Sequence, residues 1–446
     1  MEDSFKIKKI FGNSMWQISE KIITMLLSVI VTSFIARYLG TEQYGLVNYI
    51  ISVVSLFTTF STLGMEKITI NDIVENRNSK EKIIGTSFII RLIGGIVLIL
   101  ISQITLYILT DGDTVSQILG IIMGICMLFK AFEVIEYYLQ SQMNLKITSI
   151  IRFITAIVVT ITKILVVYFD FGVIGFICTY FIDAAVAGIL FFIWYKKNNK
   201  EKWKPSKEYA KSLLSRCWYV AIGGLLVTIY MRIDQVMLGS MLENKTQNGI
   251  YSAAVRIAEM WYFVPTAVIT AIQPIILKSK TNGNEDEYNK NMQRLYDIVS
   301  IISITCGIII SLFGGLVVDI LYGVEYKGAY EVLSISVWAG LFALLGTARS
   351  IWLVAEEKQK YTLVFTIMGG ATNIILNSIF IPKMGAIGAA IATLIAQFVA
   401  NVIALMPIKA TRKSSIMILK SIFCNKTVVD LIIYLRKKID TKTNAE

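Results

Sequence analysis

The long apolar stretches of this sequence contain ionisable side chains. Away from the ends of these stretches, six of the side chains are basic and six are acidic. A charge in such surroundings is costly and usually faces a cavity or a partner. Basic side chains there could bind an anionic group such as a diphosphate or an acidic sugar, and carboxylates could carry a coupling ion or form part of a gate. The candidates for binding are Arg91, Arg232, Arg256 and Lys21, and those for coupling or gating are Asp183, Asp234 and Glu259.

The apolar stretches that hold these residues are typical of membrane-spanning helices. The chain of 446 residues is 55% hydrophobic and 17% charged, whereas soluble domains carry about 25% charged residues. A spanning helix needs about 20 mostly apolar residues. The sequence predicts an all-α integral membrane protein with about twelve such helices, at residues 15–38, 44–64, 83–109, 115–139, 147–168, 172–195, 212–240, 248–277, 296–320, 329–353, 361–382 and 385–407.

The basic residues outside these helices fall almost entirely on one side of the membrane. With the N-terminus in the cytoplasm, 33 of the 43 Lys and Arg lie on the inner side and 4 on the outer side. Because cytoplasmic loops carry the excess of Lys and Arg, this distribution predicts that both termini are cytoplasmic. The formal charge of +12 then reflects topology and attraction to anionic lipid, and we expect no nucleic-acid partner. Residues 414–438 are expected to form an amphipathic helix on the inner surface.

Structural roles are the alternative for the first charged candidates. Arg91 could form a structural pair with a carboxylate on another helix, and Lys21 could reach the membrane interface by snorkelling. Lys130, Glu133 and Glu136 form a stripe that pairing within one helix and snorkelling would explain.

The remaining candidates carry a similar choice. Arg232, Asp234, Arg256 and Glu259 are expected at overlapping depths, where they could close a salt-bridge cluster or line an exit cavity. Asp183 lies near the middle of its span, which suits a carboxylate that carries a coupling ion. Because the six cations are matched by six carboxylates, net charge alone gives an anionic cargo no support.

Several kinds of chemistry are excluded or disfavoured by composition. The chain contains no His, which removes imidazole catalysis, His-bound metals and His proton relays. Its five Cys are odd in number and unclustered, so we expect neither a metal site nor a disulfide framework. Short outer loops without paired carboxylates argue against an enzyme. We expect no cofactor, and the absence of a G-x-x-x-x-G-K-[ST] loop points to an ion gradient or the membrane potential as the energy source.

The chain also divides into two similar halves of six spans. We expect an N-terminal lobe (1–195), a basic cytoplasmic connector (196–211), a C-terminal lobe (212–407) and a basic amphipathic tail (408–446). Leu39-Gly40 followed by Gly45 in the first half resembles Leu238-Gly239 followed by Gly249 in the second. An even number of spans makes the repeats parallel, and transporters built in this way hold substrate in a central cavity between the lobes.

Particular motifs resemble those of a known family. The runs ARYLGTEQYG (36–45), FSTLGMEK (60–67), RIDQVMLGSM (232–241) and NGIYSAAVRIAE (248–259) are similar to those of the polysaccharide-biosynthesis flippases of the Wzx type. These belong to the superfamily that also contains multidrug antiporters and lipid II flippases. The resemblance covers nearly the whole chain.

The resemblance implies a flippase that moves a polyprenyl-diphosphate-linked oligosaccharide across the bacterial plasma membrane by alternating access. It implies membrane lipids as surroundings, H⁺ or Na⁺ as coupling ions, and glycan polymerase machinery as a further partner. An ion-coupled multidrug antiporter of the same superfamily is the alternative. The motifs do not identify the sugars.

Overall fold

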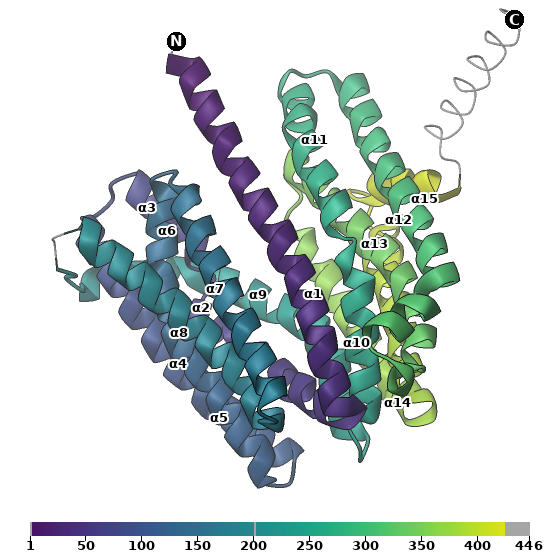
Figure 1. Ribbon diagram of the computed structural model, residues 1–446. Coiled ribbons are helices and arrows are strands. Elements are labelled where there is room, and N and C mark those ends of the chain that lie inside the picture. Colours follow the sequence, from purple (N-terminus) through teal and green to yellow (C-terminus); the bar gives the residue numbers. More distant parts are fainter. Residues whose placement is uncertain (1, 200–201, 424–446) are drawn as a thin grey trace, which may run out of the picture. The chain divides into compact units, whose positions relative to one another are not determined.

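All regular elements in the part of the chain that the structure describes are helices. The computed structural model describes residues 2–199 and 202–423, with the side chains of residues 1–22 and 26 left out. The elements (Figure 1) are α1 (Glu2–Leu56), α2 (Thr58–Thr62), α3 (Glu66–Val74), α4 (Lys80–Leu109), α5 (Thr114–Phe129), η1 (Lys130–Glu133), α6 (Val134–Ser141), α7 (Leu145–Tyr168), α8 (Gly172–Asn198), α9 (Lys207–Met241), α10 (Thr246–Met260), α11 (Phe263–Thr281), α12 (Glu285–Leu321), η2 (Val324–Tyr326), α13 (Ala329–Ala355), α14 (Tyr361–Asn401), η3 (Ile403–Leu405) and α15 (Arg412–Phe423).

Helices α1 and α14 each contain two of the expected spans. A straight helix of the 55 residues of α1 would be about 80 Å long, far more than a bilayer core of about 30 Å. The backbone leaves the helical conformation at Gly40 (φ 73°, ψ 173°) in α1 and at Gly385 (φ 56°, ψ −130°) in α14. Both φ values favour glycine. The two glycines that the sequence places between spans therefore separate two helical segments in each element.

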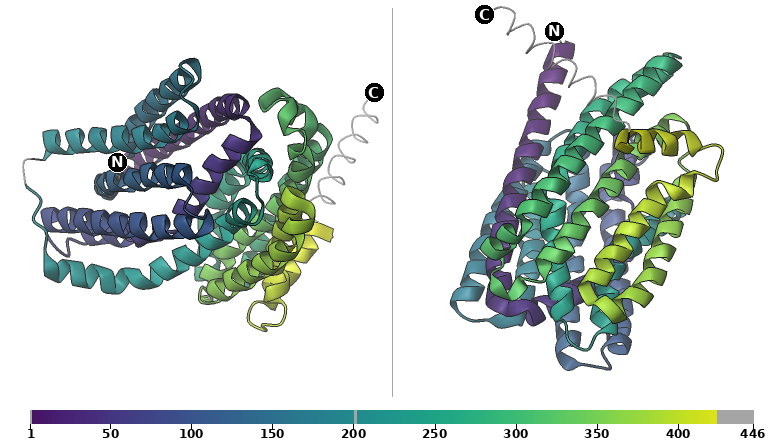
Figure 2. Two further views of the ribbon diagram at one scale, coloured as in Figure 1. Left: turned by 90° about the horizontal axis from the view of Figure 1, so that it is seen from below. Right: turned by 90° about the vertical axis from the view of Figure 1, so that its right-hand side faces the viewer.

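The expected spans fall largely on helices, but some cross a break between them: 44–64 runs from α1 through α2 to residue 64, 248–277 from α10 into α11, and 385–407 from α14 past η3. Among the described residues, nine helices are long and apolar enough to cross a membrane, or ten if α10 and α11 count as one broken span bent by 40°. Figure 2 shows the long helices from two further directions. The apolar side chains of α4 illustrate how such a helix meets lipid, because one face remains exposed at Ile93, Ile96, Leu100 and Ile104.

The chain forms two compact units, Met1–Gly249 and Ile250–Glu446. In the first unit, α4 packs on α5, and α7 packs on α1 and α8. Helix α9 packs against α1, α2 and α4 in the same unit. The expected lobe limits, with the connector 196–211 and the tail 408–446, stay a prediction.

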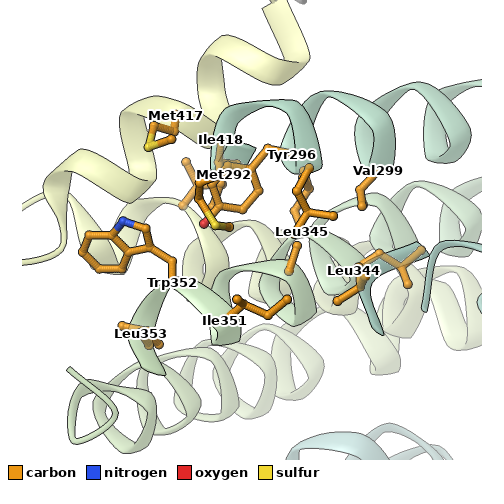
Figure 3. Close-up of a cluster of buried hydrophobic side chains, with 14 of the residues drawn as sticks. Met292, Tyr296, Val299, Leu344, Leu345, Ile351, Trp352, Leu353, Met417 and Ile418 are labelled. Carbon is orange, nitrogen blue, oxygen red and sulfur yellow. The ribbon is translucent and has the colours of Figure 1, made fainter. Parts of the chain in front are cut away.

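The second unit has an apolar core of its own. Side chains of α12, α13 and α15 meet there, as Figure 3 shows for Met292 and Tyr296 from α12, Trp352 from α13, and Met417 and Ile418 from α15. Helix α15 packs mainly on α12 and lies crosswise to it (Figure 2), with contacts to Gln293, Tyr296 and Ser300. It buries its Ser, Met and Ile face and exposes Arg412, Lys413 and Lys420. The expected amphipathic helix thus begins as a helix, and residues 424–438 lie outside the described part.

Candidate functional site

A chain of ion pairs runs through the interior of the first unit. Nη2 of Arg91 donates to Oε2 of Glu133 at 2.9 Å, and Nη1 of Arg91 donates to the Tyr137 hydroxyl at 2.8 Å. On the other side, Nη2 of Arg152 lies 3.1 Å from Oε1 of Glu133 and 2.5 Å from Oε2 of Glu136. We call these five residues the ionic cluster. Each of its four charges has at least one opposite charge in contact.

Four different elements bring the cluster together. Arg91 comes from α4 and Arg152 from α7, while Glu133 ends the 3₁₀ turn η1 and Glu136 lies in α6. A 3₁₀ turn within a helix often marks a functional hinge or strain. The expected pairing of this stripe within its own helix was wrong: in the described part of the chain, both glutamates pair with arginines of other helices.

The cluster becomes more accessible from Arg91 towards Arg152. The Arg91 side chain is 1% exposed, Glu133 is 21% exposed and Arg152 is 30% exposed. Nε of Arg91 is buried and has no hydrogen-bond partner among the described residues. A buried charge of this kind depends on its partners, because removing one partner leaves the other charge uncompensated.

A cavity of about 370 Å³ lies beside the exposed end of the cluster. Its wall includes Glu133, Glu136, Tyr137 and Arg152 of the cluster, and it is completed by Gln140 and by residues 62 and 64–66. The chain leaves the helical conformation there, between α2 and α3, where Leu63 and Gly64 both have positive φ. Broken helices at membrane depth are tolerated where they line a cavity, so the break fits its position.

Two of the sequence candidates lie in or near this cluster. Arg91 belongs to it, and the alternative of a carboxylate partner on another helix is what the structure contains. Asp183 lies in α8 and is partly buried, and it has no hydrogen bond or ion pair within the described residues. The charges of Lys130, Arg152, Lys163 and Glu133 act on it. The roles of both residues towards substrate or ions stay predictions.

The other candidates lie elsewhere. Arg232 is exposed and Asp234 is buried on α9 in the first unit. Arg256 is half-buried and Glu259 exposed on α10 in the second unit. The expected cluster of these four therefore stays a prediction. Lys21 falls within α1, but its side chain lies outside the described residues.

The family-like motifs meet in a second contact of the first unit. A Cβ added at Gly45 would lie 1.9 Å from the Lys245 carbonyl oxygen, and one at Gly249 would lie 2.0 Å from that of Thr41. The side-chain amide of Asn248 donates to the Gly45 carbonyl at 2.9 Å. The second helical segment of α1 and the α9–α10 turn thus touch backbone to backbone, which only glycine permits at these two positions.

A third contact fixes the start of α9 to α3. Nη1 and Nη2 of Arg216 donate to the two carboxylate oxygens of Asp72 at 2.7 and 2.6 Å, and the Tyr209 hydroxyl donates at 2.7 Å. Asp72 is 1% exposed. Burial alone would raise the pKa of Asp72, but the hydrogen bonds from Arg216 and Tyr209 outweigh it, so the pKa lies below its usual value.

This carboxylate predicts an acid-sensitive contact. Because the pKa of Asp72 is lower in the folded state than in the unfolded state, its contribution is complete above the unfolded value of about 4 and is lost as the pH falls through the folded value. We expect Asp72→Asn to lower the free energy of unfolding by about 1.5–3 kcal/mol at pH 7. Below pH 4 the difference from wild type should shrink, as measured by thermal unfolding of the purified protein at several pH values.

The matched control is Glu75→Gln, because Glu75 pairs with Arg77 at the surface with 51% of its side chain exposed. Such exposed pairs contribute about 0–1 kcal/mol. The role of Asp72 would be contradicted if both substitutions lowered the free energy of unfolding equally. It would also be contradicted if Asp72→Asn lowered that free energy by the same amount at pH 3 and at pH 7.

The sequence interpretation missed Arg152, Glu136 and Tyr137 as parts of one site. Arg152 lies near the inner border of the predicted span 147–168, where a basic residue is expected, and Tyr137 carries no charge that would draw attention. Glu133 and Glu136 lie near the inner end of one predicted span, and Arg91 lies on the preceding span without an obvious partner. This arrangement could have indicated that the two spans pair through these charges.

Comparisons with known proteins agree with the resemblance seen in the motifs. A family model described as polysaccharide biosynthesis protein matches residues 10–280, and the MatE family model matches residues 220–379. A Haloferax volcanii protein named probable flippase AglR is 25% identical over 61% of this chain, and the match covers 57% of that protein's own length, less than two thirds. The Staphylococcus aureus capsular polysaccharide biosynthesis protein CapF is 22% identical over 85% of this chain and 94% of its own.

Solved structures show the same fold. The lipid II flippase MurJ in an inward closed conformation superposes with a TM-score of 0.72 at 16% identity, covering 96% of this chain and 93% of that one. This likeness confirms the all-α membrane fold expected from the apolar stretches. Because the first family model covers more than half of the 446 residues, the chain belongs to the polysaccharide biosynthesis protein family.

Proposed function

We propose that this protein is a flippase that moves a polyprenyl-diphosphate-linked oligosaccharide across a membrane by alternating access. The observation that carries the proposal is family membership over residues 10–280 in a chain of membrane-crossing helices. The ionic cluster and its cavity support it, because a polar headgroup needs polar surroundings within the apolar interior of a membrane. The relatives are named for flipping or for polysaccharide biosynthesis, in keeping with a transport protein rather than an enzyme.

The location and partners follow from the same proposal. The protein would lie in the bacterial plasma membrane with both termini in the cytoplasm, which the distribution of Lys and Arg supports. Its lipid-linked substrate would come from enzymes that build glycans on the inner leaflet and would pass to glycan polymerase machinery outside. In this scheme Arg91, Arg232, Arg256 and Lys21 are the basic residues that meet the headgroup.

Energy would come from a proton or sodium gradient or from the membrane potential. Asp183 is the proposed coupling carboxylate, because it is partly buried and has neither a hydrogen bond nor an ion pair in the described chain. An acid whose charge is not committed to a partner can take up and release a cation more easily than one held in an ion pair. Asp234 and Glu259 would then serve in gating.

An ion-coupled small-molecule antiporter is the second candidate. The observation that favours it is the MatE family match over residues 220–379. The two candidates differ in cargo: the antiporter would expel soluble amphipathic cations, whereas the flippase would move a lipid whose headgroup is a glycan.

Transport in liposomes distinguishes these candidates. Purified protein is reconstituted with a fluorescent polyprenyl-diphosphate-linked oligosaccharide, and outward exposure is read with an impermeant quencher under an imposed proton or sodium gradient. We expect wild type to move the lipid faster when the gradient is present, and Asp183→Asn to remove that acceleration. If the liposomes instead expel a cationic dye and leave the glycolipid in place, the antiporter assignment is correct.

A further inference from the structure

The cavity beside the ionic cluster offers hydrogen-bonding groups that the protein itself does not use. Gln140 lines the cavity, and within the described chain its side-chain amide has no hydrogen-bond partner. The Tyr137 hydroxyl accepts a hydrogen bond from Arg91, and its own proton is directed to no acceptor among the described residues. Tyr137 is 7% exposed. Gln140 is half-buried, and polar groups that face a cavity without a protein partner are available to a bound polar molecule.

A metal ion does not fit this site. The Arg152 guanidinium already stands between the two carboxylates, at 3.1 Å from Glu133 and 2.5 Å from Glu136. That is the position a cation would need in order to contact both. Among the described residues, no group of three or more Asp, Glu, Cys or His side chains could hold a metal.

A diphosphate does not fit it either. Arg91 is 1% exposed and is absent from the cavity wall, so its charge does not face this cavity. Arg152 is compensated by two glutamates, and Glu66 adds a third carboxylate at the edge. An anion placed there would meet more negative charge than positive.

We propose that this cavity binds one neutral sugar ring of the transported glycan through its hydroxyl groups. The inference rests on the proposed flippase function and adds the chemical class of the group that the cavity takes. Hydroxyls both donate and accept, so they match a wall that has an amide, a phenol, a guanidinium and carboxylates. A neutral ligand leaves the ion pairs balanced, and about 370 Å³ lies at the low end of the roughly 300–1,000 Å³ found for small-ligand pockets. The diphosphate would then bind elsewhere.

Saturation-transfer difference NMR on the full-length protein in nanodiscs tests this proposal. The probes are methyl glycosides of neutral hexoses and N-acetylhexosamines at millimolar concentration, with inorganic pyrophosphate (³¹P) and sodium (²³Na) as comparison ligands. Gln140→Trp fills the cavity, and Gln140→Ala removes the amide together with the methylene that carries it. Gln142→Trp is the matched control, because Gln142 is exposed just beyond the same helix and is absent from the cavity wall.

We expect at least one glycoside to give a signal that falls about tenfold in Gln140→Trp, falls several-fold in Gln140→Ala, and is unchanged in Gln142→Trp. The pyrophosphate and sodium spectra should be the same in all four proteins. The proposal is overturned if no glycoside binds wild type, if Gln140→Trp retains the signal, or if pyrophosphate or sodium binding is what Gln140→Trp removes. Glycolipid transport by wild type is measured in parallel: if transport occurs without glycoside binding, only the sugar site fails, and if transport is absent, the flippase function fails.

Discussion

Arg91→Met is expected to lower the free energy of unfolding by about 3–5 kcal/mol, the cost of leaving a buried charge without its partner. Arg91 is 1% exposed and donates to Glu133 at 2.9 Å. Without it, the two glutamates of the cluster share Arg152 alone. Thermal unfolding of the purified protein measures the loss, and glycolipid transport in liposomes should fall with it.

The double variant Arg91→Met/Glu133→Gln separates structure from substrate binding. It leaves Arg152 and Glu136 as a balanced pair at 2.5 Å, so most of the lost stability should return. If transport returns as well, Arg91 acts by holding the cluster together. If the protein is stable but does not transport, Arg91 contacts the headgroup, as its residue type first suggested.

Lys130→Met is the control for Arg91→Met. Lys130 is half-buried on the 3₁₀ turn that also holds Glu133, and it has no ion pair in the described part of the chain. A loss as large as that of Arg91→Met would refute the account.

The spans were predictable because the length of an apolar stretch is a local property. The apolar stretches of about 20 residues coincide largely with helices, and Gly40 and Gly385 mark the places where the chain turns back within α1 and α14. The family could also be predicted from the motifs, because they lie in residues that the family model matches.

The ionic cluster could not be predicted in the same way. Arg91 and Glu133 are 42 positions apart, and their pairing depends on how α4 and the following helix are rotated about their axes. The 3₁₀ turn at Lys130–Glu133 changes that rotation midway, and no proline or glycine announces it in the sequence. A pattern of residue spacing along one helix therefore suggested an internal pair where the structure has pairs between helices.

The motif glycines show the opposite relation between sequence and structure. Their residue type was noticed, but tight turns were a sufficient explanation for it. The structure gives Gly45 and Gly249 a more demanding role, because each faces the other's backbone across a contact between segments about 200 residues apart in the chain. Gln235 of the RIDQ motif accepts a hydrogen bond from Ser52 in the same region. The glycines and Gln235 of the motifs thus form a packing contact.

Gly45→Ala is accordingly expected to destabilise the first unit although alanine favours helices. The added Cβ would lie 1.9 Å from the Lys245 carbonyl oxygen and 2.7 Å from the Gly249 amide nitrogen. Because both are backbone atoms, the two segments must separate, and overpacking of this kind costs about 1–3 kcal/mol or more. Gly223→Ala is the matched control: a Cβ there meets nothing within 4 Å, so alanine should stabilise the helix by about 0.5–1 kcal/mol.

Both variants replace glycine by alanine, and the glycine contact predicts changes of opposite sign in the free energy of unfolding. Comparing the two variants therefore tests the contact. Ser52 reports on the packing of α1 against α9, because it is fully buried at 0% exposure and donates to Gln235 of α9. In a cysteine-free background, we expect Ser52→Cys to react with an impermeant maleimide about tenfold faster when Gly45→Ala is present, and no faster when Gly223→Ala is present. Gly249→Ala should act like Gly45→Ala, and the two together should add little, because either one already holds the segments apart. Unchanged labelling and an unchanged unfolding temperature in Gly45→Ala would show that the contact does not form.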